Sequence, residues 1–339
     1  MEKKKCIIIA EAGVNHNGDL AMARRMVEVA RQCGADYVKF QTAVPELVIS
    51  TIAPKAEYQK ETTGNNQSQL EMCKAIHLPL SDYAGLADLC RQEGIGFMST
   101  PFDLVSIDCL APLGMDWWKI PSGEITNLPY LRKIARRGER IILSTGMSTL
   151  DEVARAVDVI EQNGTPRANV VLLHCTTQYP APYPSVNLRA MEALRTLGCG
   201  GVGYSDHTVG IEVSVAAAAM GAAVIEKHFT LDKNLPGPDH RASLDPAELK
   251  ALVDAVRHVE EAMGDGRKEV AEAERANIAV ARKSIVAARD IRRGEILTEE
   301  NITVKRPGNG LSPMLWDKVI GTAATRDFQY DSLIEIDPQ

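Results

Sequence analysis

The chain has 339 residues, of which 45% are hydrophobic and 24% are charged, and its formal net charge is −7 with a pI near 5.6. These values are typical of a globular protein with room for one large domain and one small one, and the acidic balance without a basic stripe excludes a nucleic-acid-binding surface. No apolar run is long enough to cross a bilayer or act as a signal peptide, and the seven scattered cysteines indicate reduced thiols, so we expect a cytoplasmic protein without a membrane or nucleic-acid partner.

From residue 6 to residue 230, apolar runs typical of β-strands alternate with amphipathic helical stretches. The predicted strands are 6–13, 37–42, 96–102, 117–124, 141–147, 170–176, 202–208 and 223–230, and the predicted helices include 20–33, 83–93, 150–163, 188–197, 211–220 and 246–263. About eight such units in a row are the number that closes a (β/α)₈ TIM barrel. The structural alternative is a doubly wound open sheet, which would gather its polar groups at one switch point.

Polar or charged residues follow every one of these runs, at the end where a barrel enzyme builds its site. They are Glu11, Lys39 with Gln41, Ser99 with Thr100, Lys119 with Ser122 and Glu124, Ser144 with Thr145, His174, Ser205 with Asp206 and His207, and Glu226 with Lys227 and His228. This distribution favours the barrel. The long connections 45–77 and 231–243 would lie over the same mouth, and the polar stretch 62–69 predicts a binding loop or lid.

The composition changes after the last barrel helix. A charged, alanine-rich segment is followed by short β-type runs at 284–288 and 302–305 with glycine-containing turns. We therefore expect a catalytic barrel at 1–263, a linker at 264–283 and a small separate domain at 284–339.

His207 and His228 end two neighbouring runs, and imidazoles from adjacent strands can hold a divalent cation while leaving positions open for substrate. The alternative is that both are hydrogen-bonded core residues. Glu226 shares a strand face with His228 and could bind a water on the metal, whereas Asp206 would point to the opposite face from His207. Two nitrogen ligands predict exchangeable Mn²⁺ or Mg²⁺ rather than structural zinc.

Lys39 and Lys119 are single cations in apolar runs, where an unpaired charge would cost several kcal/mol. Their partners are either carboxylates such as Glu11 and Glu124 or the phosphate and carboxylate of a substrate. The neighbouring hydroxyls of Thr100, Ser122 and Ser144 favour a phosphorylated acid. Glu11 and Glu124 could act as general acid or base, or neutralise the lysines. Arg306, in a glycine-rich turn, could clamp an acyl or carboxylate group.

At these positions the sequence resembles the sialic acid synthase family, the phosphoenolpyruvate-dependent nonulosonate synthases, which include the legionaminic acid synthases. The matching motifs run in order along nearly the whole chain: Glu11-Ala-Gly-Val-Asn-His16, Val38-Lys-Phe-Gln-Thr42, Ser99-Thr-Pro-Phe102, Lys119-Ile-Pro-Ser-Gly-Glu124, Leu143-Ser-Thr-Gly-Met147, His174-Cys-Thr176, Ser205-Asp-His-Thr208, Glu226-Lys-His-Phe229, Pro236-Gly-Pro-Asp239 and Lys305-Arg-Pro-Gly-Asn-Gly310. The resemblance implies a barrel followed by an antifreeze-like (SAF) domain.

The resemblance also implies an activity, the condensation of phosphoenolpyruvate with the aldehyde form of N-acetylmannosamine to give N-acetylneuraminate and phosphate. In this family His207 and His228 would bind the metal, most readily Mn²⁺, with Mg²⁺ or Co²⁺ as alternatives. The residues implied to hold phosphoenolpyruvate are Lys39, Thr100, Lys119, Ser122, Ser144 and Ser205. Glu11 and Glu124, with Glu226 beside the metal, would manage protons, and Gln41, Tyr179 and Asp239 would line the sugar.

The family resemblance implies a domain-swapped homodimer in which Arg306 of one subunit contacts the sugar's N-acetyl group in the other. Thr177 stands where the sialic acid synthases have asparagine, close to the sugar. Together with the segment 56–63 and the form of residues 121–127, this leaves an alternative acceptor, the 2,4-diacetamido-6-deoxy sugar of N,N'-diacetyllegionaminate synthases. The competing functions are an octulosonate or heptulosonate phosphate synthase, which would need further cations at the mouth, and a non-catalytic carbohydrate- or ice-binding protein, which would not keep Lys39, Lys119 and both histidines.

Overall fold

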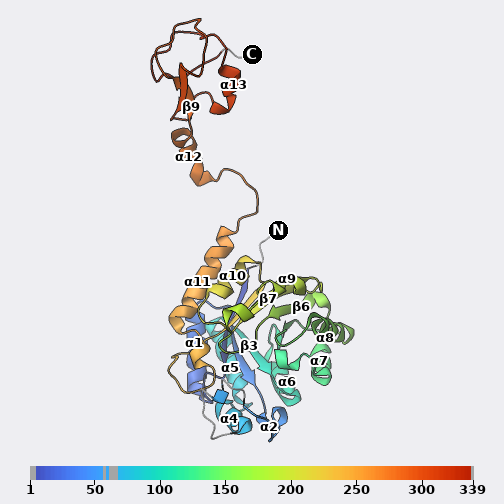
Figure 1. The fold of residues 1–339 in the computed structure, drawn as a ribbon. Helices are drawn as coiled ribbons and strands as arrows, with labels where there is room; N and C mark the ends of the chain where they lie inside the picture. Colours follow the sequence, from blue (N-terminus) through green and yellow to red (C-terminus); the bar gives the residue numbers. More distant parts are fainter. Residues whose placement is uncertain (1–4, 56–58, 61–67, 337–339) are drawn as a thin grey trace. The chain divides into compact units, whose positions relative to one another are not determined.

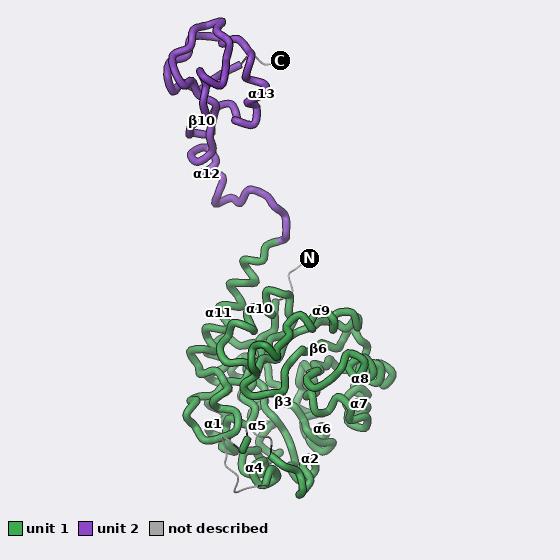
Figure 2. The backbone as a smooth tube through the Cα atoms, in the orientation of Figure 1, with its two compact units in different colours: residues 1–264 green, residues 265–339 purple. Residues whose placement is uncertain are grey.

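The structure, a computed structural model, describes residues 5–55, 59–60 and 68–336 (Figure 1). The chain divides into two compact units, residues 1–264 and residues 265–339, which are coloured separately in Figure 2. Each unit has its own hydrophobic core and is described by itself. No helix among the described residues is both long and apolar enough to cross a membrane.

Eight parallel strands form the centre of the first unit. They are β1 (Ile7–Gly13), β2 (Tyr37–Thr42), β3 (Gly96–Pro101), β4 (Trp118–Ile120), β5 (Ile141–Ser144), β6 (Val170–His174), β7 (Gly201–Asp206) and β8 (Val224–His228). Their hydrogen-bonded order is β3-β2-β1-β8-β7-β6-β5-β4, and β3 also lies against β4, so that the sheet closes on itself. The predicted (β/α)₈ barrel is confirmed.

Helices follow the strands and cover the outside of this barrel (Figure 1). They are α1 (Leu20–Gln32), α5 (Asp82–Glu93), α6 (Leu104–Leu110), α7 (Leu128–Ala135), α8 (Leu150–Gln162), α9 (Ala190–Arg195), α10 (Glu212–Ala219) and α11 (Pro246–Ala262). Side-chain caps fix where several begin: Asp19 accepts from the first turn of α1, and α8 and α11 begin with capping boxes at Thr149 and Asp245.

The alternation of side chains along each strand separates two layers. Residues that point outward, such as Ile8, Val38 and Leu172, join the core between strands and helices. Residues that point inward fill the lower barrel with a second apolar cluster, consisting of Ile9, Met98, Trp117, Ile142, Val171, Leu173 and Val224. Two residues further along most of these strands the inward positions become polar, so the apolar cluster lies beneath a polar cavity.

The structure corrects several predicted boundaries. The strand expected at 117–124 is only β4, because Pro121 lacks the backbone donor needed to continue the ladder and Ser122–Glu124 turns into a 3₁₀-helix. Helices α6 and α7 were not predicted. The connection 45–77 contains α2 (Pro45–Val48) and α4 (Gln69–Ile76), while residues 56–58 and 61–67, which carry most of the expected lid and part of the 56–63 motif, lie outside the described residues.

The second unit contains α12 (Glu272–Ala281), an antiparallel pair of β9 (Ser284–Ala287) and β10 (Ile302–Lys305), and the short helix α13 (Trp316–Val319). Its core includes Ile285, Leu297 and Phe328. Segment 264–283, expected to be a linker helix, contains α12, which bonds within this unit: the Gly308 N–H donates to the Ala279 carbonyl at 2.7 Å.

Candidate active site

A cavity of about 270 Å³ opens at the carboxyl ends of the barrel strands. Twelve of the residues singled out in the sequence line it together: Glu11, Lys39, Gln41, Thr100, Lys119, Ser122, Ser144, Tyr179, Ser205, His207, Glu226 and His228. They come from every strand of the barrel or from the loop that follows it. Strand register explains why they meet, since Glu11 pairs with Lys39 on one side and with His228 on the other.

Four buried charges form the floor of this cavity. The Lys39 ammonium lies 2.8 Å from Glu11 and 3.5 Å from Glu226, while Lys119 lies 3.3 Å from Glu226. Lys39 also donates to Thr100 Oγ1 at 3.1 Å, and Lys119 donates to Ser144 Oγ at 2.8 Å. The lysines are therefore paired with Glu11 and Glu226 rather than with Glu124. An anion entering the cavity would find two ammonium groups and several hydroxyl donors already aligned.

The two carboxylates differ in their environments. Burial alone would raise the pKa of Glu226, but the ammonium groups of Lys119 and Lys39 and a hydrogen bond from Ser205 outweigh it and hold this pKa at about 2. Burial raises the pKa of Glu11, and the charge of Glu226 adds to that rise against the opposing effect of Lys39. Glu226 is therefore the fixed negative charge, and Glu11 is the better suited of the two to exchange a proton.

His207 and His228, expected to be a metal pair, lie close together in the lining of this cavity. Their ring centroids are 5.8 Å apart. His207 Nδ1 donates to the Thr176 carbonyl at 2.7 Å, which fixes the tautomer and leaves Nε2 with its lone pair. His228 Nδ1 is buried and has no hydrogen-bond partner among the described residues. Burial lowers the pKa of His207 to about 4 and that of His228 well below its ordinary value, so both rings are neutral at pH 7.

Asp206 points away from this cavity, as its position in the strand predicted. Its carboxylate lies 2.9 Å from the Lys227 ammonium, and both side chains are almost completely buried behind the barrel wall. It also accepts hydrogen bonds from Thr208 and Ser214. Asp206 and Lys227 therefore brace the neighbouring strands β7 and β8, which carry the two histidines.

Three residues expected in the site do not line the cavity. Glu124 lies on the 3₁₀-helix after β4, where it accepts from the Asn127 side chain. Asp239 is buried in the connection after β8, and burial together with the charge of Glu11 raises its pKa to about 7. Arg306 belongs to the second unit, where its Nε donates to the Ala281 carbonyl at 3.0 Å.

Two lining residues that were not assigned to the site from the sequence are Phe102 and Met147. Met147 has a φ of 58°, a left-handed conformation that is unusual for a residue with a side chain. This conformation follows from no local sequence signal except Gly146 before it. Thr177, which also lines the cavity, was placed close to the sugar only as a departure from a family motif.

This arrangement of charged, hydroxyl and imidazole groups at the mouth of a barrel defines a (β/α)₈-barrel enzyme. Comparison with known proteins supplies the family. A family model described as the NeuB family matches residues 26–268, and one described as the SAF domain matches residues 282–337. The chain belongs to the NeuB family, which confirms the resemblance inferred from its motifs.

Individual relatives match over almost the full length. The chain is 54% identical to the N,N'-diacetyllegionaminic acid synthase of Campylobacter jejuni, with 98% of this chain and 99% of that protein covered. It is 47% identical to the enzyme of the same name from Legionella pneumophila, with 94% and 90% covered. Among solved structures, the N-acetylneuraminic acid synthetase of Leptospira borgpetersenii matches with a TM-score of 0.69 and 33% identity, covering 81% of this chain and 90% of that one.

Proposed function

We propose that this enzyme condenses phosphoenolpyruvate with the aldehyde form of an N-acetylated mannosamine-type sugar, producing a nine-carbon 2-keto acid and phosphate. The methylene carbon of phosphoenolpyruvate adds to the aldehyde carbon, and the aldehyde oxygen takes up a proton. Water then adds to the carbon that carries the phosphate, and phosphate leaves. The observation that carries this proposal is the pair Lys39 and Lys119, buried at the cavity floor with hydroxyl donors beside them.

Phosphoenolpyruvate would replace the internal partners of the two lysines. Its phosphate and carboxylate can accept from Lys39, Lys119, Thr100 and Ser144, while Ser122 and Ser205 line the same cavity. Glu11, whose pKa is raised by burial, is the group we assign to proton exchange as the carbon–carbon bond forms. Glu226 would remain ionised and hold both ammonium groups in place when the cavity is empty.

His207 and His228 would hold a divalent cation, for which we propose Mn²⁺ with Mg²⁺ or Co²⁺ as alternatives. When bound, the cation would act as a Lewis acid on the aldehyde carbonyl. The fixed tautomer of His207 and the orphaned Nδ1 of His228 are the observations that support this assignment. Two imidazoles leave room for water and substrate in the remaining positions.

Two acceptors were considered from the sequence, N-acetylmannosamine first and a 2,4-diacetamido-2,4,6-trideoxy sugar as the alternative. The relatives at 54% and 47% identity are both named N,N'-diacetyllegionaminic acid synthase, so we propose the diacetamido sugar as the acceptor. A phosphorylated sugar is disfavoured, because Lys39 and Lys119 are the only Lys or Arg residues among the described residues lining the site cavity, and both face internal carboxylates.

The expected assembly is a homodimer in which the second unit of one subunit supplies Arg306 to the barrel of the other. Arg306 is exposed, and its side chain makes one hydrogen bond to the described residues of its own unit, which leaves most of its guanidinium donors available.

Phosphate release from phosphoenolpyruvate tests the function. The purified enzyme would be assayed with Mn²⁺ and either N-acetylmannosamine or the diacetamido sugar, each with and without a chelator. We expect release that requires both metal and the diacetamido sugar, with a much smaller rate for N-acetylmannosamine. If neither sugar supports phosphate release, the condensation is refuted. Chelator-resistant release would refute only the metal assignment.

A further inference from the structure

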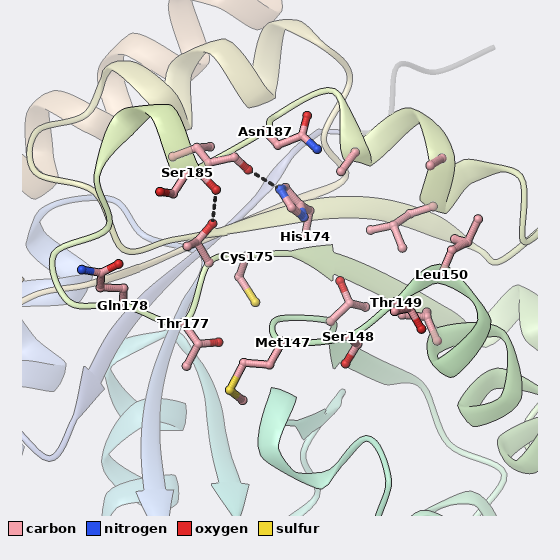
Figure 3. Close-up of a pocket in the computed structure, with 17 residues that line it drawn as sticks. Met147, Ser148, Thr149, Leu150, His174, Cys175, Thr177, Gln178, Ser185 and Asn187 are labelled. Atoms are coloured by element: carbon pink, nitrogen blue, oxygen red, sulfur yellow. Dashed lines mark hydrogen bonds between the residues drawn. The ribbon is translucent and has the colours of Figure 1, made fainter. Parts of the chain in front are cut away.

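A second cavity, of about 670 Å³, shares lining residues with the active-site cavity. Figure 3 shows the residues that line it. It is enclosed by the loop between β5 and α8, the loop after β6, and helix α9, and we call it the flanking pocket. Residues that identify it in Figure 3 are Met147, Thr149, Leu150, His174, Thr177 and Asn187. Of its residues, the family resemblance placed only Thr177 close to the sugar.

The flanking pocket and the active-site cavity share a wall. Met147, Cys175 and Thr177 line both. Gly146 packs closely against this wall: a Cβ there would clash with Thr177 Oγ1 and would lie 2.9 Å from Ser122 Oγ and 3.1 Å from Cys175 Sγ. Because Met147 and Thr177 line both cavities, these two side chains lie at the boundary between the two spaces.

The loop that forms this wall also orients the metal pair. Thr176 accepts the hydrogen bond from His207 Nδ1 at 2.7 Å, and the Tyr179 ring lies 4.1 Å from the His207 ring between centroids. An acceptor whose aldehyde lies at His207 and His228 would thus have its remaining carbons next to the loop 175–178. This places the flanking pocket within reach of the far end of the sugar.

The lining of the pocket suits an uncharged group. It includes no Asp, Glu, Lys or Arg among the described residues, so a phosphate or carboxylate would find no counter-charge. Its apolar surface comes from Leu150, Val153, Val186 and Leu194. The side chains of Thr177, Gln178 and Asn187 make no hydrogen bond to other described residues, so they remain available as donors and acceptors. An acetamido group matches both parts of this lining, because its methyl group suits the apolar side chains and its amide suits the hydrogen-bonding ones.

We propose that the flanking pocket is the subsite for an acetamido or methyl substituent on the end of the acceptor sugar away from its aldehyde. This inference rests on the proposed function and adds to it the place where the enzyme distinguishes a diacetamido sugar from a sugar with hydroxyls at those positions. Thr177 is the specificity-determining residue at the entrance, and Met147, held with a positive φ between the two cavities, forms the opposite side.

Filling the pocket tests the proposal. Ala193 lines the pocket from α9 on an exposed face, so Ala193→Phe should occupy the space without disturbing the barrel. Ala190→Leu, one turn earlier, is a second and smaller filling. The matched control is Ala216→Phe, on an exposed face of α10 and outside both cavities. The thermal midpoint of each variant should stay close to that of the wild type.

We expect the filled variants to raise KM for the diacetamido sugar by about tenfold or more, because even one misplaced methylene in a fitted pocket has an effect of that size. KM for phosphoenolpyruvate and kcat at saturating sugar should stay within about twofold of the wild-type values, since the pocket is proposed to bind only the sugar. Thr177→Val should raise the same KM while preserving the volume of the side chain.

Two results would overturn the subsite. One is an unchanged KM for the sugar in both filled variants. The other is an equal rise in KM for phosphoenolpyruvate together with a lower thermal midpoint, which would indicate a general disturbance of the fold. If the wild-type enzyme itself releases no phosphate with the diacetamido sugar, the proposed function fails and the occupant fails with it. The wild-type measurement alone distinguishes this failure of the proposed function from a failure of the subsite.

Discussion

Asp239 is a buried carboxyl group whose pKa lies near neutrality. Burial, with the charge of Glu11 nearby, raises its pKa from an ordinary 3.8 to about 7. Since the folded state holds this proton more tightly than the unfolded chain does, the stabilising contribution is full below pH 3.8. It decreases as the pH rises towards 7 and stays lost above that value.

Asp239→Asn should therefore stabilise the metal-free protein at pH 8, by an amount on the order of a few kcal/mol, because the amide needs no proton to be neutral. Near pH 4 the difference between variant and wild type should almost vanish. Thermal unfolding of both proteins at the two pH values measures this, with the exposed Asp88→Asn as the control. An equal shift at both pH values would show that the effect of Asp239 does not come from its ionisation.

The ion pair between Lys227 and Asp206 connects two elements, β8 and β7. Its side chains are 1% and 0% exposed, and its N–O distance is 2.9 Å. Lys227 also donates to the Thr208 carbonyl at 2.7 Å. Removing one partner from such a pair leaves a buried charge without compensation, which is more costly than the loss of an exposed pair.

Lys227→Met should lower the free energy of unfolding by about 3 kcal/mol or more, because the Asp206 carboxylate would remain buried. Lys250→Met removes the same kind of group from a pair with Asp254 whose side chains are 51% and 48% exposed, and should cost less than about 1 kcal/mol. Chemical unfolding of both variants compares them. Equal losses in the free energy of unfolding would mean that the buried Lys227–Asp206 pair stabilises the protein no more than an exposed pair does.

The strands could be predicted from the sequence because each is a short apolar run that is buried almost continuously, as parallel strands covered on both faces are. The alternation of side-chain direction along a strand assigned Asp206 and His207 to opposite faces, as the structure has them, and put Glu226 on the face of His228. It failed at Glu124, since the alternation continues through Lys119-Ile-Pro-Ser while Pro121 ends the ladder. The short helices α6 and α7 were missed because each shows only about two turns of apolar periodicity.

The partners of the buried charges depended on three-dimensional contacts that no sequence period reveals. Lys119 was expected to pair with Glu11 or Glu124, but its neighbour is Glu226, more than a hundred positions away. The flanking pocket was equally hidden, because its two loops and α9 become adjacent only when β5 and β6 pair. Patterns in the sequence therefore predicted which residues face the cavity better than which residues touch inside it.

At the scale of the whole molecule, the two units are separate in their packing. Residues 1–264 and 265–339 each have a hydrophobic core of their own. The residues proposed to act on phosphoenolpyruvate and metal all belong to the first unit, whereas Arg306 belongs to the second. The proposed homodimer assigns Arg306 to the active site of the other subunit, and this assignment can be tested without a structure of the complex.

Two inactive variants should restore activity when they are mixed. His228→Ala removes a proposed metal ligand, and Arg306→Ala removes the proposed sugar contact, so each homodimer should be strongly impaired. After unfolding and refolding an equimolar mixture, half of the dimers would pair one variant with the other. In those dimers the barrel with an intact His228 receives an intact Arg306 from its partner, so activity should return to about a quarter of the wild-type value.

The refolded mixture would be assayed for phosphate release and compared with each variant refolded alone and with refolded wild type. If Arg306 instead serves the barrel of its own chain, every mixed dimer has one defect in each site, and the mixture stays as inactive as its components. A monomeric protein by size-exclusion chromatography would give the same lack of recovery. Recovery near a quarter can arise only when the two units that complete a site come from different chains, because neither variant carries both groups.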